Sequence, residues 1–226
     1  MQSPNLIRLS QRLTYLKSTL TVVPKSSLIS TSAQVEVDRV SFCAIMAGAA
    51  CEKYIEEMSL QLADSSDRKF LDSNTLGRVG KYLCVFPFVE FRDNKDIKKM
   101  AAVYGATGFD IRVSSKMFVS SQRDIKELLN IGYLKIKKQI KDNHGFGLKY
   151  QLRLLSAIGA DLTSFDPTFS SRIQQLMQFR GEAAHNTVVA ATTVPTATDM
   201  ATWIDDLNVG FKKLDMQLSK LEKKVQ

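Results

Sequence analysis

The sequence has little of what would mark a disordered, secreted or membrane-spanning chain. It holds only 5 prolines and 11 glycines among 226 residues, too few for extensive disorder. No apolar run approaches the roughly 18 to 20 residues that a bilayer span needs. Arg8, Arg12 and Lys17 interrupt the N-terminal stretch, which therefore lacks the continuous apolar core of a secretory signal. We expect a soluble, cytoplasmic protein with no membrane contact.

Residues that commonly bind metals or react covalently are also scarce. The three cysteines, Cys43, Cys51 and Cys84, form no CxxC pair and have apolar neighbours, which is typical of buried reduced thiols. The two histidines, His144 and His185, lie far apart and neither has a zinc-type spacing to cysteine. The chain also lacks a complete phosphate loop, a dinucleotide fingerprint and a GxSxG nucleophile motif. We expect no metal and no cofactor.

Positive charge is plentiful and concentrated. The net charge is +8, and segment 135–153 carries six cations against one acid, a surplus of five. Segment 212–226 carries five cations against two acids, a surplus of three, so the rest of the chain is neutral. Such clustering suits contact with a nucleic acid, and the solvated face of a lysine-rich helix explains it equally well. The candidate binding residues are Lys135, Lys137, Lys138, Lys141, Lys149 and Arg153.

Apolar residues recur at helical spacing along most of the chain, which predicts an all-α fold. Leucines over 6–20 predict a first helix that Pro24 stops. An apolar stripe over 33–63, rich in small residues at its middle, predicts the central helix of a bundle. Segment 198–226 repeats apolar residues every three or four positions and predicts a C-terminal amphipathic helix. No linker divides the chain, so we expect one domain over 1–226.

The pattern is less regular over 66–118. Short helical pieces precede Pro87, and the alternation over 109–119 favours a strand. We therefore expect a small insertion of short helices or strands at 66–118. Beyond it, Ser121 and Gly132 are expected to cap and stop one helix, and Asp166 with Pro167 to begin another.

The stretch "QFRGEAAHNT" (178–187) contains the most specific pair of polar residues, Arg180 and His185. On an unbroken helix the five-residue spacing turns them about 140° apart. They converge only if the helix breaks at Gly181, or if two copies of the chain meet about a two-fold axis. The alternative is an ordinary pair of cationic residues favoured by the dipole at a helix C-terminus.

"RGEAAH" matches the R-x4-6-H signature of the HEPN superfamily (higher eukaryote and prokaryote nucleotide-binding proteins), which the chain resembles. The run "AIMAGAACEKYIEEM" is similar to the long early helix of stand-alone prokaryotic HEPN nucleases, and the resemblance extends over about 33–190. One departure is Gly181, where the family usually has a polar residue. The resemblance implies a HEPN-like helical bundle, a homodimer and metal-independent cleavage of RNA.

The resemblance also implies roles for individual residues. His185 would transfer a proton and Arg180 would stabilise the phosphate while the ribose 2′-hydroxyl attacks phosphorus. Glu52 would hold Arg180 or His185 in place, unless it is a plain surface carboxylate. The basic residues of 135–153 would guide the RNA, in a toxin–antitoxin or antiviral defence system with an antitoxin or other partner. The competing hypothesis is a non-catalytic helical protein that binds nucleotide, nucleic acid or a partner protein.

Overall fold

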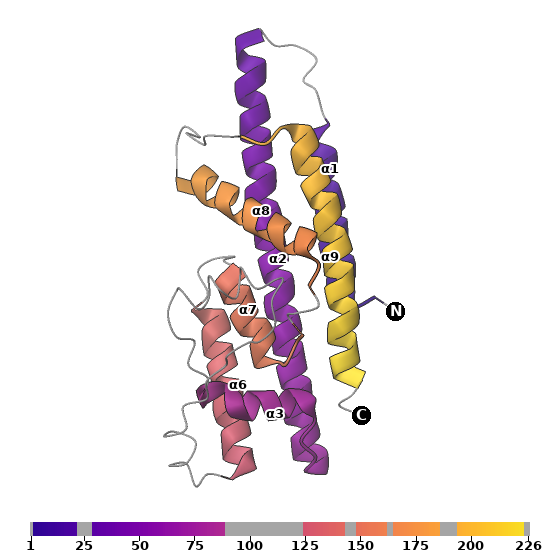
Figure 1. Cartoon of the computed structure of the whole chain (residues 1–226), viewed down its shortest axis with the longest axis vertical. Coiled ribbons are helices and arrows are strands. Elements are labelled where there is room, and N and C mark those ends of the chain that lie inside the picture. Colours follow the sequence, from indigo (N-terminus) through magenta and orange to yellow (C-terminus); the bar gives the residue numbers. More distant parts are fainter. Residues whose placement is uncertain are drawn as a thin grey trace. The chain divides into compact units, whose positions relative to one another are not determined.

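A computed structural model describes residues 2–21, 29–88, 124–142, 148–161, 165–185 and 194–223 of the chain. These residues form helices joined by turns, and no strand occurs among them, which confirms the all-α prediction. The elements are α1 (Pro4–Leu20), α2 (Ile29–Ser73), α3 (Arg78–Val85), the short 3-10 helix η1 (Phe86–Phe88), α6 (Ile125–Lys141), α7 (Leu148–Ala157), α8 (Pro167–His185) and α9 (Ala197–Lys223) (Figure 1).

The chain divides into two compact units, and the helices α2 and α9 contribute to both. Unit 1 consists of residues 1–54 and 166–215, and unit 2 consists of residues 55–165 and 216–226. Each unit is therefore assembled from segments that are distant in sequence. The expectation of one domain over 1–226 stays a prediction.

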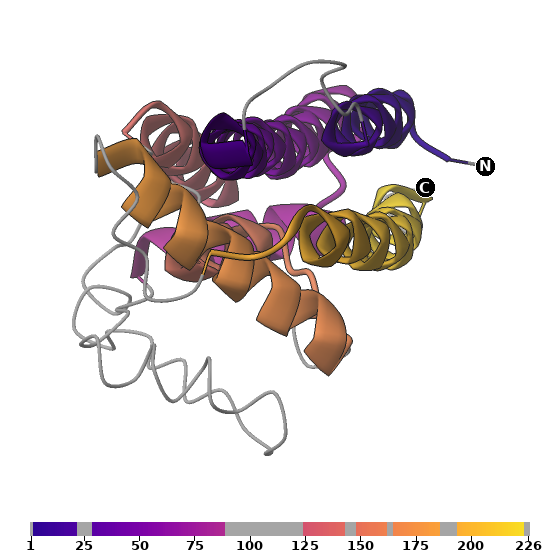
Figure 2. The same cartoon turned by 90° about the horizontal axis from the view of Figure 1, so that it is seen from above.

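Unit 1 packs α1, the first part of α2, α8 and most of α9 around a shared apolar core. Figure 2 shows α1 (indigo) and α9 (yellow) running alongside each other. The phenyl ring of Phe211 on α9 is fully buried and meets the rings of Tyr54 and Phe169 edge-on, at 5.2 and 5.0 Å between centroids. Edge-to-face contact is a favoured arrangement of aromatic pairs, so these rings join α2, α8 and α9.

A buried carboxylate anchors the start of α1. Asp215 is 1% exposed and accepts hydrogen bonds from the Ser3 amide (3.0 Å), the Ser3 hydroxyl and the Tyr54 hydroxyl (3.0 Å). The Ser3 hydroxyl oxygen also accepts from the amide of Leu6 (3.1 Å) and so caps α1. Burial and the nearby charge of Asp215 raise the pKa of Tyr54, which keeps its hydroxyl proton available for this hydrogen bond.

Unit 2 packs α3 across α6, next to the second part of α2 and α7. The hydroxyl of Tyr133 on α6 donates to the Asp64 carboxylate on α2 at 2.6 Å. At Gly132, an added Cβ would lie 1.9 Å from the Leu83 carbonyl oxygen, so only glycine lets α6 approach α3 this closely. The expectation that Gly132 stops the helix is therefore wrong, because α6 continues through it to Lys141. The glycine is needed there for close packing of α6 against α3.

The observed boundaries extend several of the predicted helices. The helix expected over 33–63 is α2, which continues to Ser73, and the predicted C-terminal helix is α9. Asp166 and Pro167 begin α8 as predicted. The described part of the expected 66–118 insertion consists of helices and a short connection. The strand expected over 109–119 lies outside the described residues. So do the helix stop expected at Pro24 and the cap expected at Ser121.

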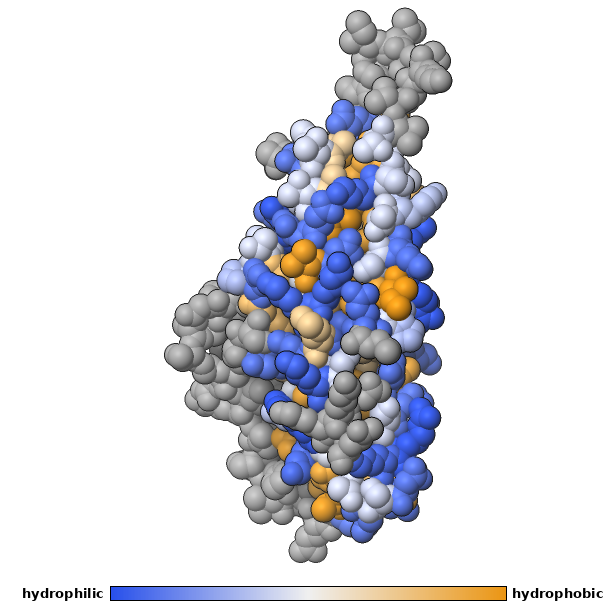
Figure 3. All heavy atoms as spheres, turned by 90° about the vertical axis from the view of Figure 1, so that its right-hand side faces the viewer, coloured by the Kyte–Doolittle hydropathy of each residue, from blue (hydrophilic) through white to orange (hydrophobic). Residues whose placement is uncertain are grey.

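The described helices keep most of their large apolar side chains in the core. On the face shown in Figure 3, hydrophobic side chains lie in small separate groups among hydrophilic ones. None of the described helices combines the length and the hydropathy needed to cross a membrane.

Candidate functional site

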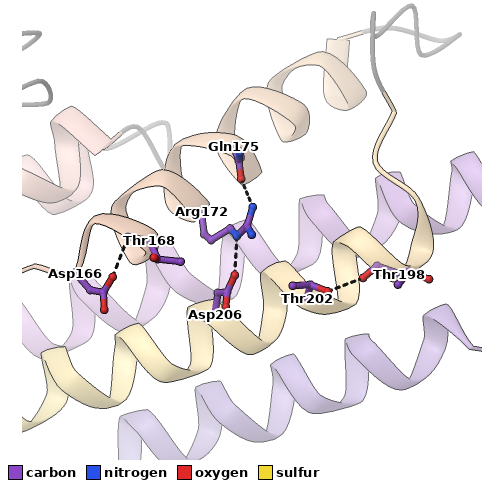
Figure 4. Close-up of polar contacts among 7 residues, drawn as sticks. All are labelled: Asp166, Thr168, Arg172, Gln175, Thr198, Thr202 and Asp206. Carbon is purple, nitrogen blue, oxygen red and sulfur yellow. Dashed lines mark hydrogen bonds and ion pairs between the residues drawn. The ribbon is translucent and has the colours of Figure 1, made fainter.

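Helix α8, which carries the Arg180–His185 pair, is held firmly at its beginning. The Asp166 carboxylate accepts a hydrogen bond from the Thr168 amide at 2.9 Å and caps the first turn. The Arg172 guanidinium donates to Asp206 on α9 and to Gln175 one turn further on, both at 2.7 Å (Figure 4). Lys213 on α9 pairs with Asp166 at 2.8 Å, which helps to hold the pKa of Asp166 below its usual range. These contacts fix α8 against α9.

Arg180 lies where α8 meets α2. Its Nη1 atom donates to Oε2 of Glu52 at 3.3 Å, and the two side chains are 26% and 14% exposed. The aliphatic part of Arg180 lies over Gly48, where an added Cβ would be only 2.8 Å from Cδ. The small-residue run of α2 therefore makes room for the arginine stem, while the guanidinium keeps some exposure to solvent. The structure thus brings Glu52 and Arg180 together, although 128 positions separate them.

His185 is the last residue of α8, and the helix reaches it without a break. Gly181 is helical, and an added Cβ there would meet nothing within 4 Å. Of the two alternatives for convergence, a helix break at Gly181 is therefore not observed, because a glycine inside a helix keeps helical geometry when its neighbours support it. Positions 180 and 185 therefore lie about 140° apart around the helix axis.

A cavity of about 440 Å³ lies along another side of α8. Two carboxylates, Glu182 and Asp199, line it together with the indole of Trp203, and Arg180 is not among its lining residues. The remaining lining residues are Gln175, Gln178, Phe179, Val194 and Pro195. Its carboxylates make this cavity a poor place for a phosphate, which would be repelled.

The basic residues of 135–153 belong to unit 2, and the structure separates them into different environments. Lys135, Lys138 and Arg153 line one groove of about 320 Å³ between α6 and α7. Lys137 instead contacts Tyr133, with its Nζ atom 3.3 Å from the hydroxyl and 4.9 Å from the ring centroid. Lys141 is exposed but does not line the groove, and the side chain of Lys149 lies outside the described atoms.

The groove also contains residues that sequence reasoning missed. Tyr150, Gln139, Asp142 and Leu154 complete its lining. The signal for Tyr150 was its position inside the basic segment, since aromatic residues among cations are typical of nucleic-acid contact. Gln139 carries no such signal, because only the packing of α6 against α7 places it there.

The electrostatics of the groove are dominated by two neighbouring cations. The Lys135 Nζ atom is 3.1 Å from the Pro87 carbonyl oxygen and 3.4 Å from that of Phe86, and it lies 5.1 Å from the Phe86 ring centroid. Burial and the positive charge of Arg153 lower the pKa of Lys135. No ion pair with a carboxylate is found for Lys135 among the described residues.

A metal-binding group among the described residues or a similar known protein would also indicate a function. Among the described residues, no group of three or more His, Cys, Asp or Glu side chains is placed to hold a metal ion. Comparison of the chain with protein family models, with curated proteins and with solved structures finds no match in any of the three. The resemblance to the HEPN superfamily therefore remains a prediction from the residues of its motif.

Proposed function

We propose that the protein is a metal-independent endoribonuclease of the HEPN type that acts as a homodimer. The observation that supports this most directly is the Arg180–Glu52 pair, which holds a partly exposed guanidinium at the meeting of α8 and α2. The same helix carries His185 at its end. A positioned guanidinium and an imidazole are the groups that phosphodiester cleavage by an internal hydroxyl requires.

The proposed reaction needs no nucleophile from the protein. The ribose 2′-hydroxyl of RNA attacks the adjacent phosphorus as an imidazole of His185 accepts its proton. The P–O5′ bond breaks, which leaves a 2′,3′-cyclic phosphate and a 5′-hydroxyl that takes up a proton. Arg180 stabilises the charge that develops on the phosphate oxygens, and Glu52 positions Arg180. A guanidinium has five N–H donors, so the contact with Glu52 leaves donors for the phosphate.

A second copy of the chain is part of the proposal. Because α8 is unbroken, Arg180 and His185 of one chain lie on different sides of the helix. Two α8 helices related by a two-fold axis would bring arginine and histidine from different chains to one phosphate. Ala183 is small enough to allow such an approach. The site is incomplete in a monomer.

The resemblance extends the proposal to a biological setting. Stand-alone prokaryotic HEPN nucleases suggest a toxin–antitoxin or antiviral defence system, in which an antitoxin or another partner restrains the enzyme. The competing proposal is a protein that binds RNA or another nucleic acid without cutting it. The cationic groove of unit 2 favours this second function, because cations beside an exposed aromatic ring suit contact with a nucleic acid.

Incubation of the purified protein with RNA in excess EDTA separates the two functions. Under the nuclease proposal, cleavage survives chelation and leaves cyclic phosphate ends. Arg180→Gln reduces the cleavage rate by about 100-fold or more, since removal of one charge-stabilising donor commonly has that effect. Arg12→Gln is the matched control, because it makes the same charge change on α1 of the same unit, where Arg12 lies over the ring of Tyr15, and it leaves most of the activity.

Mixing two inactive variants tests the shared site. Arg180→Gln and His185→Ala chains, inactive alone, regain part of the activity when they exchange subunits, because one of the two sites in the mixed dimer is then intact. RNA that stays uncut in every condition, by a folded protein, overturns the nuclease proposal. Retained binding of that uncut RNA supports the non-catalytic function instead.

A further inference from the structure

We infer that the groove between α6 and α7 binds one nucleotide of a single-stranded RNA, with Lys138 and Arg153 on its phosphate and Tyr150 against its base. This inference rests on the proposed function for the identity of the strand, since it adds a second contact to the RNA that the enzyme cuts. It is more specific than a general attraction of RNA to positive charge. It assigns roles to three of the six candidate basic residues, Lys135, Lys138 and Arg153, and adds the uncharged Tyr150 and Gln139.

The placement of the cations is the first argument. Lys135 and Lys138 lie one turn apart on α6, and Arg153 reaches the same groove from α7. Lys138 is exposed, and its terminal ammonium is available to a ligand phosphate. Lys135 is held in place by the carbonyl oxygens of Phe86 and Pro87, so it supplies fixed positive charge behind the two groups that contact the ligand. Three positive charges around one hollow attract an anion strongly.

The mutual repulsion of these cations is the second argument. Lys135 is about half buried, and Arg153 lies close enough to disfavour its charged form. A bound phosphate would offset this repulsion, because its negative charge attracts both cations. Asp142 also lines the groove, but it is exposed at the end of α6 and contributes one charge against three.

The aromatic ring of Tyr150 is the third argument. It is 43% exposed, and the Arg153 guanidinium lies 6.0 Å from its ring centroid. An exposed ring beside a guanidinium is the combination that binds nucleotides in single strands, where the ring stacks on a base and the cation contacts the phosphate. A site for inorganic phosphate alone would not need the ring.

The size and the polar lining of the groove fit one nucleotide. Its volume of about 320 Å³ lies at the lower end of the roughly 300 to 1,000 Å³ of small-molecule sites. The Oε1 atom of Gln139, which lines the groove, is buried without a hydrogen-bond partner among the described residues. When the side-chain amide turns toward the groove, this oxygen can accept from a ribose hydroxyl or a base amino group, neither of which a bare phosphate has.

Binding is measured separately from cleavage. The fluorescence anisotropy of a labelled, unstructured RNA of about twelve nucleotides is followed in the Arg180→Gln background, so that the strand stays intact during titration. Lys138→Gln is expected to weaken binding about five- to tenfold and to lower the slope of log K against log salt by about 1. Tyr150→Leu weakens binding about tenfold with no change in that slope.

The matched control is Lys126→Gln. Lys126 is exposed near the start of the same helix α6 and lies outside the groove, so its substitution changes binding less than twofold. Equal weakening by Lys126→Gln and Lys138→Gln, in proteins with unchanged circular dichroism, would overturn the inference and leave only diffuse attraction. An unaltered affinity in Tyr150→Leu would overturn the base contact.

Competition identifies the ligand. Adenosine monophosphate is expected to displace the RNA at concentrations where inorganic phosphate does not. Equal displacement by the two contradicts the nucleotide and reduces the groove to an anion site. The two proposals fail separately: an uncut RNA that still binds in the groove refutes only the nuclease, and a cut RNA indifferent to Lys138→Gln refutes only the groove.

Discussion

The buried or half-buried charges of Asp215 and Arg180 in unit 1 have different surroundings from that of Lys135 in unit 2. In unit 1, Asp215 accepts three hydrogen bonds and Arg180 is paired with Glu52, so each charge has partners inside the unit. In unit 2, Lys135 contacts carbonyl oxygens and an aromatic ring, and Arg153 is its repulsive neighbour.

In unit 1 the charges lie beside groups of opposite polarity, whereas in unit 2 two like charges lie close together. A polar group with complete internal partners is costly to change and has little left to offer an external molecule. A cation beside another cation weakens folding slightly and gains when an anion binds. Arg180 differs from Asp215 in this respect, because its one contact with Glu52 orients the guanidinium and leaves other N–H donors. The like charges of unit 2 are the reason for proposing an anion there.

Replacing one charge in each unit tests this contrast most strongly. Asp215→Ala is expected to lower the free energy of unfolding by about 3 kcal/mol, because it leaves the part-buried donors of Ser3 and the buried hydroxyl of Tyr54 without an acceptor. Lys135→Met is expected to leave stability unchanged or to raise it, since the substitution removes a charge that burial and Arg153 disfavour. Urea unfolding measures both.

The control for Asp215→Ala is Asp205→Ala on the same helix. Asp205 also pairs with α1, through Lys17, but its side chain is 58% exposed. An exposed pair contributes about 0 to 1 kcal/mol, so this variant should unfold nearly as the native protein does. If both substitutions lowered the free energy of unfolding equally, the buried hydrogen bonds of Asp215 would contribute no more to stability than the exposed ion pair of Asp205.

The thiol of Cys43 makes the free energy of unfolding depend on pH. Burial raises the pKa of Cys43 in unit 1 to about 11, so the folded protein keeps a proton that the unfolded chain loses near pH 9. Stability from this thiol is complete below about pH 9 and decreases as pH rises toward 11, by about 2 kcal/mol. Urea unfolding at pH 8 to 11 should show a shallower decline in Cys43→Ala. A decline identical to that of the native chain would contradict this.

The smallest expected effect concerns glycines inside helices. Gly181 in unit 1 has open space where a side chain would lie, so Gly181→Ala should raise the free energy of unfolding by about 0.5 to 1 kcal/mol. Gly132 in unit 2 faces the Leu83 carbonyl, so the same substitution there should destabilise the protein. Thermal unfolding compares them, and a loss of stability in Gly181→Ala would mean that α8 does not continue as described.

Most of the helices could be predicted from the sequence because their apolar residues follow one period over many turns. The starts of helices that depend on local chemistry, such as Asp166 with Pro167, were also predictable. Gly132 was misread as a helix stop. Glycine serves both as a stop and as a point of close approach, and only the position of Leu83 on another helix decides between them.

The candidate site was predictable only in part, for the same reason. The spacing of Arg180 and His185 is visible in the sequence, but only the structure shows that α8 continues through Gly181 and keeps the two positions about 140° apart around its axis. The groove of unit 2 depends on contacts between α6 and α7 that no local pattern specifies. Tyr150 and Gln139 join Lys138 there through packing alone.

The contact between Ser3 and Asp215 has a consequence for synthesis in the cell. Its two residues are separated by 212 positions, so the start of α1 gains its acceptor only after Asp215 has left the ribosome. Residues 55–165 leave the ribosome earlier and carry most of unit 2. Unit 2 can therefore begin to fold while α1 and the first part of α2 still wait for α8 and α9. During that interval the leucines of α1 lack the core that α8 and α9 complete.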